Sequence, residues 1–282
     1  MLLHIEYDSN HGTSQGIWTR FYLQILALGE LAVGKDEFEK RTKLYFDKVI
    51  PDLTNLYDIY HKLIATINDY KVGVENGKYF KVDERGHSSL DRLNEVTIRN
   101  LTKDFIIRAK ILQVNFFKCG FADEDNFKLT NFFTFEKNKL AERKKLYLKK
   151  SDGKYLPLIN LIEKANDNFL KQLTDLRGAI EHDLFSLEKF QLNRKDNIAT
   201  ISEPDLEGQL LSTKLKFFYE NSLEFIEKMM VYYFGVNGEV NKNGFLQLYV
   251  DDVFDYSEMR WKYTFALGGT PWSFTSKKCL YD

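Results

Sequence analysis

Hydrophobic periodicity over residues 156–184 is the feature that most constrains the fold of this chain. Apolar side chains recur there at steps of three and four: Leu158, Ile162, Ala165, Phe169, Leu173, Leu176, Ile180 and Leu184. This spacing places side chains on one face of an α-helix, whereas a half-buried strand would need a spacing of two. The segment therefore predicts a long amphipathic helix that buries one face.

Further segments show the same helical periodicity. They are residues 16–33, 36–49, 52–70, 90–118 and 207–234. Gly34 is expected to close the first of these helices, and Pro51 is expected to end the second. Either Ser88 or Ser89 is expected to cap the helix that begins near residue 90.

Strands are expected only in short stretches between and after these helices. Asn76-Gly77 is a dipeptide typical of hairpin turns and predicts a hairpin within residues 72–87. Residues 185–206 predict a second hairpin, with its turn near 194–197. The tail contains two strand-like runs, LQLYVDDVF and RWKYTFAL, and a turn is expected at Gly268-Gly269. Residues 120–154 show no clear pattern and are expected to be irregular.

The chain is therefore expected to be mostly α-helical. We divide it into an N-terminal helical extension over residues 1–87, a helical bundle over 88–235, and a strand-containing tail over 236–282. The chain has 282 residues, of which 44% are hydrophobic and only 4 are proline. A chain of this length and composition can bury a sizeable core, and it shows no proline-rich linker.

Composition limits the partners and the location that we expect. The net charge is −1, so a nucleic-acid partner would need a local basic patch rather than a global positive field. Cys119 and Cys279 form no CxxC pair, the N-terminus carries no secretory signal, and no apolar run reaches the roughly 20 residues of a membrane span. The five histidines lack the spacing of a zinc site. We expect a cytoplasmic protein with no membrane partner, no metal and no cofactor.

One motif on the 156–184 helix points to a chemistry. The string DLRGAIEHD covers residues 175–183 and places four residues between Arg177 and His182, with a leucine before the arginine and Glu181 before the histidine. This arrangement resembles the HEPN superfamily, whose members carry the same arginine and histidine pair. The resemblance extends to the order of the helices and covers residues 88–235. Many members have a polar residue directly after the arginine, where this chain has Gly178.

The resemblance implies a HEPN-like helical bundle that forms a homodimer and binds RNA. For catalytic members it implies metal-independent endoribonuclease activity, in which a 2′-hydroxyl attacks the adjacent phosphate. Carried onto this sequence, His182 would move the proton, Arg177 would bind the phosphate, and Glu181 would orient Arg177 or the partner helix. A role as a toxin or defence effector is a further implication of the resemblance.

Helix geometry bears on how Arg177 and His182 can act together. On a helix with 3.6 residues per turn and a rise of 1.5 Å per residue, the two lie about 140° apart around the axis and about 7.5 Å apart along it. One straight helix cannot aim both side chains squarely at one atom. Two copies of the helix packed across a two-fold axis can supply one residue each to a shared cleft.

The same residues allow two other functions. A non-catalytic HEPN-like module would bind nucleotides or RNA, or would regulate a partner enzyme, whereas a helical scaffold would have no nucleic-acid role. On a purely structural interpretation of the motif, Arg177 and Glu181 would form an ion pair within the helix, and a partly buried His182 would bond to a backbone carbonyl.

A basic segment precedes the motif helix. Residues 137–150 contain seven basic side chains and one acidic side chain. The predicted RNA-binding set consists of Arg143, Lys144, Lys145, Lys149 and Lys150. Because basic side chains bind a phosphate backbone and aromatic rings stack on bases, we also expect Tyr147 to serve as a stacking surface. The alternative interpretation is a solvated helix face or loop.

Overall fold

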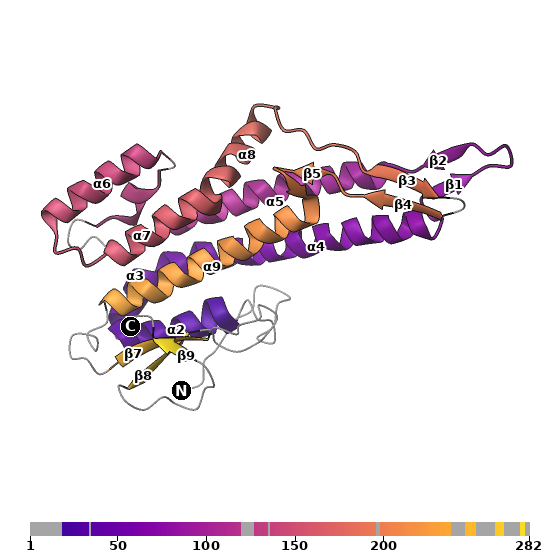
Figure 1. Ribbon diagram of the computed structural model, residues 1–282. Coiled ribbons are helices and arrows are strands. Elements are labelled where there is room, and N and C mark those ends of the chain that lie inside the picture. Colours follow the sequence, from indigo (N-terminus) through magenta and orange to yellow (C-terminus); the bar gives the residue numbers. More distant parts are fainter. Residues whose placement is uncertain are drawn as a thin grey trace. The chain divides into compact units, whose positions relative to one another are not determined.

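The computed structural model describes residues 19–33, 35–119, 127–134, 136–195, 198–237, 246–251, 263–267 and 277–279. Helices make up most of this part of the chain (Figure 1), so the mostly α fold class expected from the sequence is confirmed. Within the same residues, no helix is both long enough and apolar enough to cross a membrane.

The helical segments include three of π-type (η1, η2 and η4) and one 3₁₀ turn (η3). In chain order the helices are η1 (Thr19–Gln24), α2 (Ile25–Val33), α3 (Lys35–Leu44), η2 (Tyr45–Val49), α4 (Ile50–Glu75), α5 (Leu93–Lys118), η3 (Leu129–Phe132), α6 (Lys137–Lys150), α7 (Leu156–Ala165), η4 (Asn166–Leu170), α8 (Lys171–Glu181) and α9 (Leu211–Asn237). The strands are β1 (Phe80–Val82), β2 (Ser88–Leu90), β3 (Gln191–Lys195), β4 (Ile198–Ser202), β5 (Asp205–Leu206), β6 (Gln209–Leu210), β7 (Leu246–Asp251), β8 (Tyr263–Leu267) and β9 (Lys277–Cys279).

The described residues belong to two compact units, each built from separate stretches of the chain. The first unit takes the described residues up to Ile50, then Phe116–Lys164, and then those from Glu224 onward. The second unit takes Pro51–Asn115 and Ala165–Leu223. The second unit therefore contains α8 and the Arg177–His182 motif, whereas the basic helix α6 belongs to the first.

In the second unit, α4 and α5 run antiparallel (Figure 1). Asn115 Nδ2, near the end of α5, donates to Asp52 Oδ2, near the start of α4, at 2.7 Å. Toward the other ends, Tyr70 OH donates to Glu95 Oε1 at 3.0 Å. Apolar side chains at helical spacing are buried on both helices; they include Leu56, Leu63, Ile67, Ile98, Phe105, Ala109 and Leu112. This burial, rather than helix propensity alone, stabilises both helices.

The helix that carries the motif packs antiparallel to α9 within the second unit. Lys214 Nζ on α9 donates to Gln172 Oε1 on α8 at 2.7 Å, and Asn168 Nδ2 on η4 donates to Asn221 Oδ1 on α9 at 2.7 Å. Position numbers rise along one helix as they fall along the other. These two bonds therefore fix both the direction and the register of α8 against α9.

All strands in the described residues pair as antiparallel neighbours. In the second unit β1 pairs with β2, β3 with β4, and β5 with β6. The hairpin predicted over residues 185–206 is confirmed by the β3–β4 pairing, in which Leu192 faces Ile201. Both strands predicted in the tail are also confirmed: β7 lies between β8 and β9, with Leu248 opposite Phe265. The turn predicted at Gly268-Gly269 lies outside the described residues.

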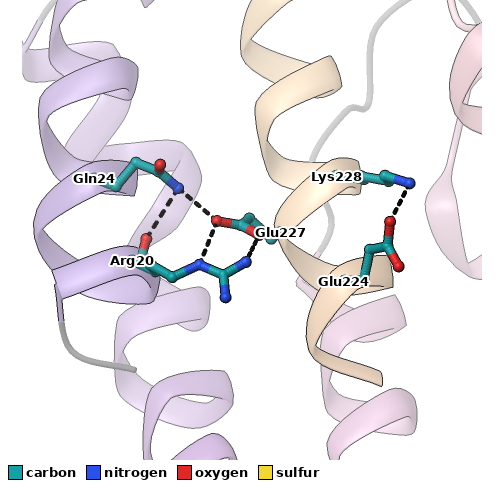
Figure 2. A network of polar contacts seen from close by, with 5 residues as sticks. All are labelled: Arg20, Gln24, Glu224, Glu227 and Lys228. Atoms are coloured by element: carbon teal, nitrogen blue, oxygen red, sulfur yellow. Dashed lines mark hydrogen bonds and ion pairs between the residues drawn. The ribbon is translucent and has the colours of Figure 1, made fainter. Parts of the chain in front are cut away.

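The first unit holds a fully buried ion pair (Figure 2). Arg20 on η1 is 1% exposed and Glu227 on α9 is 0% exposed. Arg20 Nε donates to Glu227 Oε1 at 3.0 Å, Arg20 Nη2 donates to the other carboxylate oxygen, and Gln24 Nε2 donates to Oε1 at 2.8 Å. Burying an unpaired charge costs several kcal/mol, so Glu227 is tolerated in the core because these donors surround it.

A tyrosine lies close to this ion pair. Tyr45 OH donates to the backbone carbonyl of Phe21 at 2.8 Å, and the ring is fully buried. Burial, followed by the negative charge of Glu227, raises the pKa of the Tyr45 hydroxyl well above its ordinary value. The hydroxyl is therefore neutral and acts as a hydrogen-bond donor.

Pro51 does not end a helix, contrary to the prediction from the sequence. The segments α3, η2 and α4 follow one another without a break, and Pro51 is the second residue of α4. Here it directly follows η2, where the π-type pattern already changes the backbone hydrogen bonding.

The Asn76-Gly77 pair ends α4 and does not form a hairpin turn. Gly77 has a φ of 78°, the left-handed conformation that terminates many helices. The hairpin turn lies further along, where Asp83 Oδ1 accepts hydrogen bonds from the backbone N–H groups of Arg85 at 2.9 Å and His87 at 2.8 Å. The prediction of a hairpin in this region was right, but its turn was misplaced.

Two other local predictions were wrong. Neither Ser88 nor Ser89 caps α5, because both lie in β2; instead Asp91 Oδ1 accepts a hydrogen bond from the Leu93 N–H at 2.9 Å. Residues 137–150, expected to be part of an irregular region, form the helix α6. In α6 only a few apolar positions face inward, so its helical period is weak in the sequence.

Candidate functional site

The motif lies at the C-terminal end of α8, and the chain turns sharply after it. Asp183 adopts a φ of 56°, its N–H bonds to the Ile180 carbonyl at 3.3 Å, and the Leu184 N–H bonds to the Ala179 carbonyl at 2.8 Å. These two bonds form a Schellman motif, which satisfies the last carbonyls of a helix. The helix therefore ends at Glu181, whereas the sequence predicted that it would continue to residue 184.

Contacts with α5 hold the chain after this turn. Arg99 Nη2 on α5 donates to the Leu187 carbonyl at 3.4 Å, and Lys103 Nζ lies 6.0 Å from the centre of the Phe185 ring. Leu184, which the periodicity placed on the buried face, is 75% exposed. The left-handed residue before it breaks the helical spacing and so removes Leu184 from that face.

All three residues predicted to be catalytic lie at the surface of the second unit. The Arg177 side chain is 44% exposed and forms an ion pair with Glu181, one turn away on the same helix. His182 is the C-cap residue, it is exposed, and its ring bonds to no described residue. The alternative of a partly buried His182 held by a backbone carbonyl is therefore wrong, whereas the Arg177–Glu181 ion pair of that alternative is present.

Gly178 leaves an open surface between the motif residues. A Cβ atom added to Gly178 would meet nothing within 4 Å. Thr174, Gly178 and His182 follow one another at steps of four and so lie along one line of the helix surface, with Arg177 and Glu181 on the adjacent line. A small anion or a backbone group can therefore approach α8 closely between Thr174 and His182.

Lys110 is a residue of this region that the sequence analysis missed. It lies on α5, is 8% exposed, and its Nζ donates to Thr174 Oγ1 on α8 at 2.8 Å. Burial, followed by the positive charge of Arg177, lowers the pKa of Lys110 to about 7. Two cationic side chains from different helices therefore lie near one another at the Thr174 end of the open surface.

A signal for Lys110 is present in the sequence. Thr102, Ile106, Lys110, Gln113 and Phe117 follow one another at steps of three and four, and all five are buried. A lysine on an inward-facing row is unusual, because lysines are almost never buried unless they have a partner. The pattern marks the position, but it does not reveal a partner that is 64 residues away in the sequence.

The basic helix α6 is divided between structural and exposed side chains. Arg143 donates to the Asn131 carbonyl, and Lys144 Nζ forms an ion pair with Glu163 Oε2 at 2.7 Å. The remaining members of the predicted RNA-binding set, Lys145, Lys149 and Lys150, are exposed. Arg143 and Lys144 therefore bind partners within the protein, whereas these three side chains are exposed.

The stacking role expected for Tyr147 is wrong, because its ring is buried. It is 3% exposed, and its hydroxyl accepts a hydrogen bond from the Tyr155 N–H at 2.8 Å. The ring contacts those of Phe127 and Phe132, with centroids 5.9 and 6.3 Å away. Tyr147 therefore anchors α6 in the first unit instead of offering a ring to a base.

Across the ranges that the structure describes, no group of three or more His, Cys, Asp or Glu side chains is arranged to hold a metal ion. Arg177, His182 and Lys110 are suited to an anion and to proton transfer rather than to a cation. Comparison with known proteins gives no match to this chain, whether by family model, by curated sequence or by solved structure.

Proposed function

We propose that this protein is an RNA-binding, HEPN-like homodimer that cleaves RNA without a metal ion, with Arg177 and His182 as its reactive residues. The observation that carries the proposal is the exposure of both side chains at the end of α8, beside the open surface at Gly178. An arginine and a histidine that were merely part of a core would have no such access to solvent.

The proposed chemistry is transfer of a phosphoryl group within the RNA chain. The 2′-oxygen of one ribose attacks the adjacent phosphorus, the bond to the 5′-oxygen of the next nucleotide breaks, and a cyclic phosphate and a 5′-hydroxyl remain. An imidazole can take the proton from the 2′-hydroxyl and return a proton to the leaving 5′-oxygen. A guanidinium binds the phosphate through two parallel N–H donors and stabilises the charge that develops on it.

Arg177 must exchange its partner for this reaction to occur. Its guanidinium binds the Glu181 carboxylate, and both side chains are more than two-fifths exposed. An exposed ion pair of this kind contributes only about 0–1 kcal/mol. A phosphate dianion or the RNA backbone can therefore displace Glu181 from Arg177 at small cost.

A second candidate function, RNA binding without cleavage, is favoured by the same ion pair. If Glu181 stays on Arg177, the positive charge next to the scissile phosphate is neutralised and only binding remains. Exposed lysines on α6, such as Lys145 and Lys149, would supply binding without any reaction. Cleavage of RNA by the wild-type protein would exclude this candidate.

The first test is cleavage of single-stranded RNA by the purified protein in EDTA. We expect wild-type cleavage to yield cyclic phosphate ends, and we expect His182→Ala to reduce the rate by about 10²–10⁴-fold, the usual contribution of general acid–base catalysis. His87→Ala is the matched control, since His87 is an exposed histidine of the same unit. Equal rates in wild type and His182→Ala would contradict the nuclease proposal.

A second test addresses the dimer. Arg177→Gln and His182→Ala are each expected to be inactive alone. If each site takes arginine from one subunit and histidine from the other, an equal mixture forms hybrid dimers with one intact site, and about a quarter of the wild-type activity returns. If the mixture stays inactive although the subunits exchange, the two residues do not act across a dimer.

A further inference from the structure

Lys110 is a buried charged group of the second unit that lies beside the motif helix and that the proposed reaction does not use. Its Nζ reaches across from α5 to Thr174 on α8 and donates a hydrogen bond at 2.8 Å. Thr174 is only partly buried, and its own hydroxyl donates to the Leu170 carbonyl at 2.8 Å. The ammonium of Lys110 therefore lies directly beneath Thr174, which is partly exposed on α8.

Thr174 and Arg177 are three positions apart, which is about one helical turn. The Lys110 ammonium, bonded to Thr174, therefore lies within about one turn of the position of Arg177 on α8. An anion bound near both cations would be attracted to each of them and would offset their mutual repulsion. The open surface at Gly178, four residues after Thr174, leaves room for such an anion.

We propose that Lys110, Thr174 and Arg177 form a second phosphate-binding subsite for RNA, placed over the turn of α8 between Thr174 and Gly178. This inference rests on the proposed function for the identity of its ligand. Thr174 and His182 are eight residues apart, which is about 12 Å along a helix that rises 1.5 Å per residue. Arg177 is shared with the reacting phosphate, because a guanidinium has five N–H donors, so the phosphate at this subsite is a neighbour of the reacting one along the RNA.

This subsite gives Lys110 a binding role and not a role in the chemical step. Its loss should weaken the binding of RNA, or raise KM, and leave kcat nearly unchanged, since the interaction is the same before and during the reaction. Lys110 is thus a binding residue, distinct from the reactive pair.

The decisive experiment follows the titration of Lys110 by NMR of its side-chain carbons and uses sulfate as the probe. Sulfate is a tetrahedral dianion that does not titrate near neutral pH, so it can stand in for phosphate in this measurement. At constant ionic strength, exchange of chloride for sulfate is expected to raise the pKa of Lys110 above its value of about 7, because an anion in contact favours the charged ammonium. Lys171, an exposed lysine on α8, is the internal control and should not respond.

Two variants test the composition of the subsite. Arg177→Gln and Thr174→Val are each expected to abolish or sharply reduce the response to sulfate. If sulfate leaves the Lys110 pKa of the wild-type protein unchanged, the proposed subsite is wrong. A response that persists in full in both variants would overturn the assignment of Arg177 and Thr174.

RNA binding supplies an independent readout. In a His182→Ala background, which prevents cleavage, Lys110→Met is expected to reduce the slope of log K against log salt by about 0.7, the value for one phosphate contact on a single strand. Lys110→Arg retains the charge and should restore the slope, whereas Lys171→Met should leave it unchanged. An unaltered slope in Lys110→Met would contradict the subsite.

The two proposals fail in different ways. A protein that neither binds nor cleaves RNA but shows the sulfate response retains the anion subsite and loses the proposed function. A protein that cleaves RNA through His182 while the Lys110 pKa ignores sulfate retains the proposed function and loses the subsite.

Discussion

The pairs Arg20–Glu227 and Arg177–Glu181 join the same two residue types in opposite surroundings. The first is buried, bridges η1 and α9 of the first unit, and includes Gln24 as a third donor (Figure 2). The second lies within one helix of the second unit, and each side chain is more than two-fifths exposed. Water can replace either partner at the second pair but not at the first. The buried pair is therefore a structural element, whereas the exposed pair can be exchanged for a ligand.

The largest expected effect is the loss of the buried carboxylate. Glu227→Ala leaves Arg20 charged in the core without its partner, and we expect the free energy of unfolding to fall by about 3–5 kcal/mol. Chemical denaturation followed by circular dichroism measures this change. The double variant Arg20→Met/Glu227→Met removes both charges. If it restores most of the stability, the loss in Glu227→Ala comes from the unpaired charge and not from the cavity. If Glu227→Ala lowers the free energy of unfolding by less than about 1 kcal/mol, the buried pair contributes no more to stability than the exposed Arg177–Glu181 pair.

The expected change in stability at Lys110 lies, in size, between those of the buried and the exposed ion pair. Lys110 is buried, but it lies beside a second cation. Lys110→Met is expected to stabilise the protein by about 2 kcal/mol below pH 7, because it removes a charge that burial and Arg177 both disfavour. Denaturation over a pH series measures the difference between the variant and wild type.

The pH dependence of that difference follows from the lowered pKa. Below pH 7 both the folded and the unfolded chain hold the proton, so the full cost of burying the charge is present. Between about pH 7 and the ordinary lysine value of 10.5, the folded protein releases the proton while the unfolded chain keeps it, and the stability of the wild type rises. The advantage of Lys110→Met should therefore shrink as pH rises through this range. An advantage that is constant with pH would show that packing, and not charge, is responsible.

These residues also show what could be inferred from the sequence. The helices α5, α8 and α9 follow from apolar spacing, because burial of one face imposes the 3.6-residue period on the sequence. The position of Arg177 and His182 on the last turns of a helix follows from the same spacing. What could not be inferred is the pairing of Arg20 with Glu227, which are 207 positions apart, or of Lys110 with Thr174.

The ends of the elements were harder to predict because the same residue types serve different turns. Asn76-Gly77 is as suitable for a helix end as for a hairpin, since both use a glycine with positive φ. After α8 the left-handed position is filled by Asp183 and not by glycine, so the usual mark of a helix end is missing. Only the contacts of each segment with the rest of its unit decide between such alternatives.

Two glycines lie in similarly contrasting surroundings: Gly178 has open space beside it, whereas Gly29 lies against aromatic rings. Gly178→Ala adds a methyl group that meets nothing, and we expect it to stabilise the protein by about 1 kcal/mol through helix propensity. Gly29→Ala in the first unit is the matched contrast, because its methyl group would clash with the rings of Phe38 and Phe234. Thermal denaturation of both variants should give shifts of opposite sign. If Gly178→Ala destabilises the protein, the surface beside His182 is not open in solution.

The smallest expected effect belongs to the exposed pair. Glu181→Gln removes one charge from an ion pair at positions i and i+4 of a helix, and we expect the free energy of unfolding to fall by only about 0.2–0.5 kcal/mol, less at high salt. RNA binding should respond in the opposite direction: freeing Arg177 from its competitor should strengthen binding measured by fluorescence anisotropy. Glu224→Gln, which breaks an ion pair with Lys228 at the same spacing on α9, is the control and should cost similar stability without affecting RNA. If Glu181→Gln weakens RNA binding, Glu181 holds Arg177 in position for RNA instead of competing with it.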